Sequence, residues 1–240
     1  MTTLYGWGPM FDLPGPSPYV MKADIQMQML GAPFTRALAE LDSVAKHKAP
    51  YVVDDGVLIE DSTFIRMHFE RKLGKDLDEC LTPAQRGQAW AVERLLEDRL
   101  GLIMVCERWL VDANFDKGPS QFFADVPEAM RAQVISEVRG GVAASMKGHG
   151  IGRHSREERM LLAERDVGAV AAMLGEGPFL FGAKPTAADA VAYGVLAACG
   201  TPFFSTPLVA LIDAQPNLRP YLARMEARFV HEAAWPSMAA

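Results

Sequence analysis

The chain has 240 residues, of which 50% are hydrophobic and 22% charged, and its formal net charge is −6. These proportions exclude a disordered or fibrous chain, and no basic run is long enough for a nucleic-acid surface. No signal-peptide pattern opens the sequence, and no apolar run approaches the ~18 residues of a membrane span. We therefore expect a soluble, cytoplasmic protein in which Cys80, Cys106 and Cys199 are reduced thiols.

The first part of the chain begins with strand and helix signals in turn. Residues 3–7 are typical of a strand, and a loop rich in proline follows. Ser17 before Pro18 predicts the N-cap and first position of a helix, which Gly31 ends. Residues 32–49 carry no clear pattern.

A hairpin and a second helix are expected next. Residues 51–53 and 57–59 are apolar runs around Asp-Asp-Gly, a strong turn signal. Asp61 and Ser62 then cap a helix that ends at Gly74. The order is therefore strand, helix, an unassigned stretch, two strands and a helix.

The remainder is predicted to be helical throughout. N-cap and capping-box signals open helices after Thr82, Pro127, Ser155, Thr186 and Asn217, which extend to about residues 111, 146, 174, 199 and 230. The polar stretch at residues 75–81 separates the two kinds of pattern. We expect an α+β protein with an α/β domain at residues 1–76 and an all-helical domain at 82–240.

Two predicted helix N-termini combine a capping role with possible chemistry. Ser17 at a helix N-terminus is either a simple N-cap or a donor to a thiolate, which the helix dipole also favours. Asp61 and Ser62 are either a cap or a site for an α-amino acid group. In that reading the helix N-terminus binds the carboxylate and Asp61 binds the ammonium.

Other candidates have less to support them. Pro50 is either an ordinary trans-proline at a strand start or a cis-proline that exposes backbone groups to a peptide-like ligand. His149, Arg153 and His154 lie in the segment GHGIGRHS, which contains no carboxylate or cysteine, and this favours a structural or interdomain role over a metal site. No metal is expected, and the methionines are interpreted as core residues.

The order of these sites resembles the glutathione transferase superfamily. The similar segments are SPYVMK at 17–22, KAPYVVDDG at 48–56, IEDSTFI at 59–65 and PTAAD at 185–189. DLDECLTPAQR, CERWL, GIGRHSREE and GPFLFGAKPTAADA are similar to the branch with the failed-axon-connections and metaxin-like proteins. The resemblance implies a thioredoxin-like N-terminal domain followed by an all-helical domain.

The resemblance also implies a role for each matching residue. Pro50 would be the cis-proline, with the Ala49 backbone pairing with the cysteinyl part of glutathione. Asp61 would bind the γ-glutamyl ammonium and Ser62 the γ-glutamyl carboxylate. Ser17 would activate the thiol. Lys46 or Lys48 would meet the glycyl carboxylate.

The implied activity is attack of the glutathione thiolate on a small apolar electrophile, with glutathione as cosubstrate. The electrophile would lie near Phe11, Met104 and Trp109. The alternatives are a non-catalytic interaction module and a glutathione-dependent isomerase, peroxidase or dehalogenase. The loop before Ser17 is longer than in most members of the superfamily. Tyr5 and Trp7 lie near the position where other classes of the superfamily have a catalytic tyrosine, but Tyr5 is expected within the strand and Trp7 has no hydroxyl.

The superfamily also implies a homodimer. It pairs the α/β domain of one subunit with the helical domain of the other. Phe64, Met67 and Phe69 compete for the buried face of one helix, and Trp90 could meet those left exposed across a two-fold axis.

Overall fold

The computed structural model describes residues 1–230 together with Trp235 and Pro236. The strands are β1 (Thr2–Gly6), β2 (Thr35–Leu38), β3 (Tyr51–Asp54) and β4 (Val57–Glu60). The α-helices are α1 (Pro18–Leu30), α2 (Ser62–Leu73), α3 (Pro83–Leu95), α4 (Gly101–Leu110), α5 (Asp112–Lys117), α6 (Glu128–His149), α7 (Arg156–Leu174), α8 (Ala187–Gly200), α9 (Pro207–Asp213) and α10 (Leu218–Phe229). Short 3-10 helices are η1 (Leu41–Ser43), η3 (Pro119–Phe123) and η4 (Ile151–Arg153), and a π-helical turn, η2 (Leu96–Leu100), joins α3 to α4.

The four strands form one sheet in the order β2-β1-β3-β4. β1 runs parallel to β2 and antiparallel to β3, and β3 runs antiparallel to β4. The end of β1, the start of β3 and the end of β4 therefore lie at the same edge of the sheet. The chain segments attached there are the ones that the sequence analysis selected as candidate sites.

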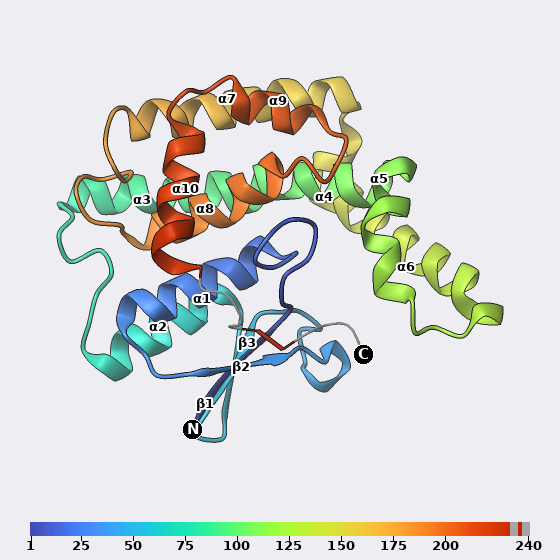
Figure 1. Ribbon diagram of the computed structural model, residues 1–240, viewed down its shortest axis with the longest axis horizontal. Coiled ribbons are helices and arrows are strands. Elements are labelled where there is room, and N and C mark those ends of the chain that lie inside the picture. Colours follow the sequence, from blue (N-terminus) through green and yellow to red (C-terminus); the bar gives the residue numbers. More distant parts are fainter. Residues whose placement is uncertain (231–234, 237–240) are drawn as a thin grey trace.

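Helices α1 and α2 lie between the sheet and the helical layer (Figure 1). Their inner faces pack on the sheet in one small core made by Leu4, Ala23, Met27, Leu30, Ala32, Val52, Ile65 and Phe69. Ser17 caps α1 and Gly31 ends it in the left-handed conformation, as expected from the sequence. Asp61 caps α2 and Gly74 ends it in the same way.

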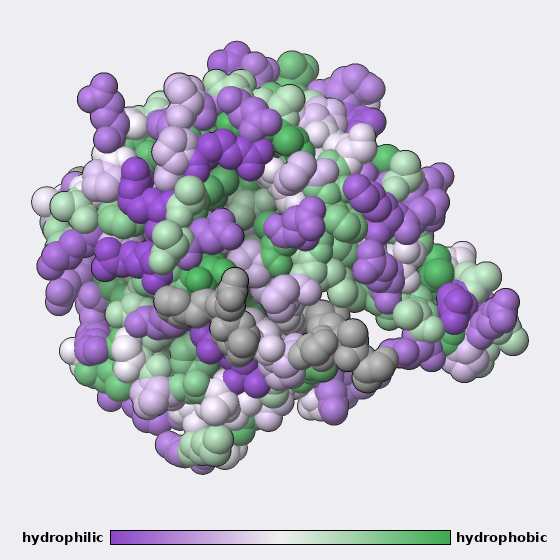
Figure 2. Space-filling view, in the orientation of Figure 1, coloured by the Kyte–Doolittle hydropathy of each residue, from purple (hydrophilic) through white to green (hydrophobic). Residues whose placement is uncertain are grey.

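The second, larger core belongs to the helical part, where α8 is almost entirely buried. Helix α8 crosses the start of α1 at Gly194, where an added Cβ would lie 2.6 Å from the carbonyl oxygen of Pro18. Glycine is therefore the residue that allows this approach. Helix α6 projects from the rest of the molecule (Figures 1 and 2), and its one buried side chain is Met146.

The structure confirms the α+β class and adds elements that the sequence did not predict. The unassigned stretch contains β2 and η1, and two short helices, α5 and α9, follow Val111 and Thr206. The expected helix from residue 83 to about 111 ends at Leu110 and contains the π-helical turn. In the described part of the chain, the search for a helix long and apolar enough to cross a membrane finds none.

Candidate functional site

The candidate residues meet at the sheet edge defined above. Ser17 begins the helix after β1, Pro50 precedes β3, and Asp61 follows β4. The backbone N–H of Asp61 donates to the carbonyl oxygen of Pro50 over 3.4 Å, which joins two of the three segments. The Ala49–Pro50 peptide bond is cis, which is the second of the two alternatives considered for Pro50.

Asp61 has an unusual backbone conformation for a non-glycine residue, with φ at 86°. One carboxylate oxygen accepts the N–H of Thr63 over 2.9 Å, and the other has no hydrogen bond to a described residue. Ser62, the first residue of α2, is 4% exposed. The N-terminus of α2 thus offers N–H groups and a free carboxylate oxygen side by side, the combination that suits an α-amino acid group.

Lys22 of α1 places a positive charge beneath this helix start. Its ammonium donates to Oγ1 of Thr63 at 3.0 Å and to Glu97 at 2.8 Å, and the side chain is 1% exposed. Glu93 lies 3.6 Å away and also accepts from Arg66 of α2. Lys22 is not among the site residues predicted from the sequence, where the available signal is a lysine among the apolar residues of the first helix.

Ser17 lies at the start of the helix that carries Lys22. Its hydroxyl accepts the N–H of Val20 at 3.4 Å, and it precedes Lys22 by five residues, about 7.5 Å along the helix. The hydroxyl proton remains free to donate to a group at the N-terminus of α1, since the oxygen acts here as acceptor. The N-termini of α1 and α2 both favour negative charge at this edge.

The two candidate lysines differ in their contacts. The Lys46 ammonium donates to the Glu60 carbonyl at 3.3 Å and lies over the ring of Phe64, 4.9 Å from its centroid. Lys48 is exposed and forms no hydrogen bond or ion pair with a described residue. Lys48 therefore has the freer ammonium for an anionic ligand.

The residues expected around the electrophile are only partly brought together. Phe11 and Met104 are buried, at 4% and 3% exposure, while Trp109 is half-buried and stacks on Phe122. Phe122 of η3 also contacts the rings of Phe11 and Trp7. The sequence analysis missed Phe122, which belongs to a segment without a regular pattern.

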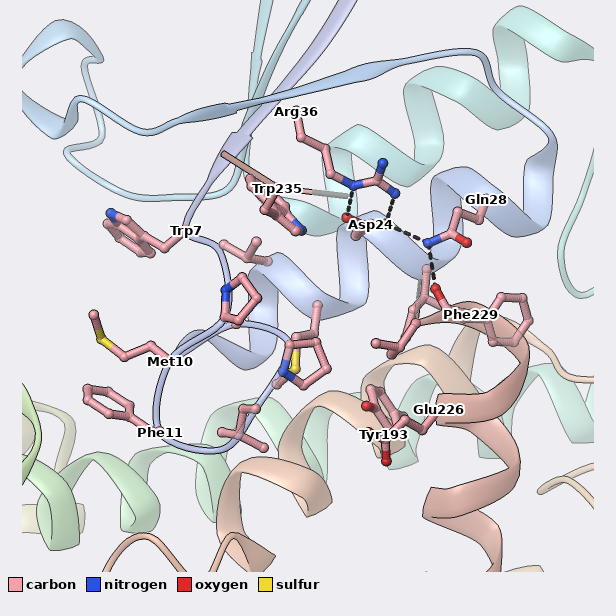
Figure 3. Close-up of a pocket in the computed structure, with 18 of the residues that line it drawn as sticks. Trp7, Met10, Phe11, Asp24, Gln28, Arg36, Tyr193, Glu226, Phe229 and Trp235 are labelled. Carbon is pink, nitrogen blue, oxygen red and sulfur yellow. Dashed lines mark hydrogen bonds and ion pairs between the residues drawn. The ribbon is translucent and has the colours of Figure 1, made fainter. Parts of the chain in front are cut away.

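A cavity of about 710 Å³ lies on the other flank of α1, beside β2 and α10 (Figure 3). Phe11 lines it, whereas Met104, Trp109 and the residues of the sheet-edge site do not. Its polar side is an ion pair in which Arg36 donates to both oxygens of Asp24, and Gln28 bridges Asp24 to the Phe229 carbonyl. The polar groups of Asp24, Gln28 and Arg36 therefore bond to one another and to the Phe229 carbonyl.

Two residues of the GHGIGRHS segment, Arg153 and His154, contact residues close to them in sequence. Arg153 donates to the Lys147 carbonyl, and His154 lies 3.7 Å from Glu158. In the described residues no group of three or more His, Cys, Asp or Glu side chains is suited to a metal ion. Cys106 and Cys199 are buried and Cys80 is exposed, all as free thiols.

Comparison with known proteins gives a consistent result. Family models for the glutathione S-transferase N-terminal domain and C-terminal domain match residues 18–114 and 163–225. The chain is 32% identical to an isoprene-epoxide–glutathione S-transferase from a Rhodococcus species, over 95% of this chain and 99% of that protein. It is 28% identical to Failed axon connections from Drosophila melanogaster, over 77% of this chain and 46% of that protein.

Solved structures show the same fold at low identity. A β-etherase from a Sphingobium species has a TM-score of 0.67 and 13% identity, covering 95% of both chains. A glutathione S-transferase from Methylobacterium radiotolerans, in complex with glutathione sulfonate, has a TM-score of 0.61 and 19% identity, covering 100% of this chain and 97% of that one. With the full-length relative at 32% identity, these findings show that the chain belongs to the glutathione S-transferase family.

Proposed function

We propose that this protein is a glutathione transferase that joins the thiolate of bound glutathione to a small apolar electrophile. The observation that carries the proposal is the meeting of Ser17, Ala49-Pro50 and Asp61-Ser62 at one sheet edge, two of them at helix N-termini. Glutathione has two carboxylates, one ammonium and one thiol. The edge offers helix N-termini, the free Asp61 oxygen and the Ser17 hydroxyl to these groups.

The proposed roles follow the chemistry of each group. Asp61 binds the γ-glutamyl ammonium, Ser62 and the start of α2 bind its carboxylate, and the Ala49 backbone pairs with the cysteinyl unit. Lys48 binds the glycyl carboxylate because its ammonium is exposed. Ser17 donates a hydrogen bond to the sulfur, which favours the thiolate.

The energetic requirement for thiol activation is modest. A thiol with a pKa of about 8.5 is only a few per cent ionised at neutral pH, and lowering that pKa by two units requires about 2.7 kcal/mol. A hydrogen bond to a charged group contributes about 1.5–3 kcal/mol. Ser17 and the α1 dipole therefore suffice in magnitude.

A small epoxide is the first electrophile to test. The 32% identical relative is named for isoprene epoxide and glutathione, and the aromatic cluster of Phe11, Trp109 and Phe122 favours an apolar second substrate. Ring opening forms a carbon–sulfur bond and breaks a carbon–oxygen bond, and the resulting alkoxide takes a proton from solvent.

The test is conjugate formation with a small alkene epoxide, followed by mass spectrometry. We expect enzyme-dependent conjugate at neutral pH and at least a tenfold lower rate for Ser17→Ala, after correction for the fraction folded. Ser17→Ala also removes an N-cap, which costs about 1 kcal/mol of stability. Absence of conjugate with epoxides, alkyl halides and activated alkenes alike would contradict the transferase proposal.

A second candidate is a non-catalytic module that retains the fold. The similarity to Failed axon connections is the observation that favours it. The two candidates differ in one property that can be measured directly: the transferase binds glutathione at the sheet edge, and a module that has lost the site does not. Glutathione binding without any conjugation would favour a glutathione-dependent isomerase or peroxidase instead.

A further inference from the structure

Arg108 of α4 is a buried cation that has no carboxylate partner among the described residues. Its side chain is 4% exposed, and its two terminal nitrogens donate to the carbonyl oxygens of Pro16 at 2.9 Å and Ala198 at 2.6 Å. Its Nε has no hydrogen-bond partner among the described residues. Buried charges are normally paired, so this arrangement calls for a functional explanation.

In the described part of the chain, aromatic rings and carbonyl groups rather than carboxylates surround the Arg108 guanidinium. The guanidinium lies 4.7 Å from the ring centroid of Phe204 and 5.8 Å from that of Phe11. Burial lowers its pKa to about 10, so it stays charged at neutral pH. Burial also raises the pKa of the neighbouring Cys199 thiol to about 12, so that group is neutral.

The other ionisable groups nearby do not neutralise Arg108. Glu107, the preceding residue, accepts instead from Arg156 and Thr206. Asp12, on the loop before α1, is exposed to solvent. Lys117 adds a further positive charge, over the ring of Phe203. The C-terminal carbonyls of α8 supply about half a negative charge, which offsets Arg108 only in part.

Arg108 also fixes the segment that carries Ser17. The Pro16 carbonyl that it holds belongs to the residue directly before Ser17, and the hydroxyl of Thr201 donates to the Phe11 carbonyl at 2.8 Å. The long loop between β1 and α1 is thus tied to the helical domain at two points. In Figure 1 this loop lies beneath α4 and α8.

We propose that Arg108 is a positioning residue that fixes Ser17 through the Pro16 carbonyl. Its unpaired charge also favours the thiolate form of bound glutathione, an inference that rests on the glutathione site proposed above. Arg108 bonds the carbonyl directly before Ser17, so a sulfur atom hydrogen-bonded to the Ser17 hydroxyl would lie within roughly 11 Å of the guanidinium. At that separation and an effective dielectric constant of about 20, a unit charge lowers a thiol pKa by about one unit.

The test compares substitutions at the two residues that hold this loop, of which one removes the charge. Arg108→Gln keeps an amide donor for the Pro16 carbonyl, and Thr201→Val removes the second tie without changing any charge. The readouts are the pKa of the bound thiol, from thiolate absorbance across pH, and the affinities for glutathione and S-methylglutathione, from calorimetry. S-methylglutathione has no ionisable thiol and reports binding alone.

We expect Arg108→Gln to raise the bound-thiol pKa by about one unit and to lower neutral-pH turnover up to tenfold, while S-methylglutathione affinity changes less than threefold. Thr201→Val should leave that pKa within about 0.3 unit of the wild type. An unchanged pKa in Arg108→Gln, or an equal rise in Thr201→Val, would overturn the proposal.

A wild-type measurement covers the case in which Arg108→Gln does not fold. Glutathione sulfonate, an anion at the sulfur position, should bind wild-type protein at least tenfold more tightly than S-methylglutathione, and equal affinities would overturn the proposal. If the wild-type protein binds no glutathione, both the proposed function and this inference are wrong. If glutathione binds but the pKa of its thiol does not change in Arg108→Gln, only the inference is wrong.

Discussion

At the scale of single residues, the site depends on a carboxylate that the helix cap does not fully use. Asp61 caps α2 with one oxygen and leaves the other free of described partners. If residue 61 served only as a cap, asparagine would serve equally well, because aspartate and asparagine are comparable N-caps. A charge is needed only if Asp61 binds a cation such as the γ-glutamyl ammonium.

The substitution Asp61→Asn separates these two roles. We expect glutathione binding to weaken by about 1.5–3 kcal/mol, or roughly ten- to 150-fold, because a charge-assisted hydrogen bond is lost. The midpoint of urea unfolding should change little. A calorimetric titration gives the affinity, and an unchanged dissociation constant would show that Asp61 serves the helix alone.

The helix caps could be predicted from the sequence, whereas the buried side chains that hold the capped helix starts in place could not. Ser17, Asp61 and both glycine helix ends follow from local chemistry, which depends on a few neighbouring residues. Arg108 and Lys22 act through partners 41 to 92 positions away in the chain. Arg108 shares a helix face with Met104, so a charge on an apolar face was the available signal.

At the scale of elements, the hairpin of β3 and β4 is tied to α2 by Asp54. This carboxylate is 3% exposed and accepts from Thr2 at 2.6 Å, His68 at 2.7 Å and Lys72 at 2.7 Å. Burial by itself would raise the pKa of Asp54, but the hydrogen bonds from Lys72, Thr2 and His68 hold it well below its usual range. The stabilisation from Asp54 is therefore complete above about pH 4 and is lost as the pH falls further.

Asp54→Asn should destabilise the fold by about 1–3 kcal/mol at neutral pH, because the buried charged hydrogen bonds are lost. The difference from the wild type should shrink between pH 4 and pH 3, where the unfolded chain takes up the proton. Urea unfolding at several pH values measures this. Asp55→Asn is the matched control, since the Asp55 side chain is 66% exposed and should contribute little at any pH. A difference that does not depend on pH would contradict this account.

The crossing of α8 over α1 gives a second prediction at this scale. In Gly194→Ala the new methyl group would meet the Pro18 carbonyl at 2.6 Å, so we expect a loss of about 1–3 kcal/mol in unfolding free energy. Gly168→Ala in α7 is the control, because no atom lies within 4 Å of its added Cβ. That change should stabilise the protein by about 0.5–1 kcal/mol. Equal effects of the two substitutions would refute the close packing of α8 on α1.

The elements that the sequence missed share a physical cause. β2 is a four-residue edge strand that includes half-exposed residues, so it shows no clean alternation, and its Arg36 is fixed by Asp24 on α1. α5 and α9 have six and seven residues and depend on their neighbours for stability. Long amphipathic helices and their caps can be predicted from neighbouring residues in the sequence, whereas the conformation of these short segments depends on tertiary contacts.

At the scale of the whole molecule, an exposed apolar surface on α2 and α3 is the expected dimer contact. Phe64, Met67 and Trp90 are 54%, 39% and 44% exposed, while Phe69 lies in the core. Arg66 of α2 pairs with Glu93 of α3, which keeps the two helices together. Clustered apolar side chains on a protein surface are typical of an interaction site.

We expect light scattering to give twice the chain mass of 26.2 kDa at micromolar concentration. Trp90→Lys should shift the protein toward the monomer, because a charge would replace an apolar contact on both sides of a two-fold interface. Leu161→Lys is the control, since Leu161 is 63% exposed on α7, away from this surface. A wild-type monomer, or the same shift in the control, would rule out this interface.

The most direct test of the whole account is a calorimetric titration of the wild-type protein with glutathione at pH 7, repeated in buffers with different ionisation enthalpies. The account predicts saturable binding of one glutathione per chain. It also predicts release of about 0.7 proton, which a thiol pKa lowered by two units from about 8.5 requires at this pH. Absence of saturable binding, or binding with no dependence on the buffer, would contradict the claim that this site holds glutathione as its thiolate.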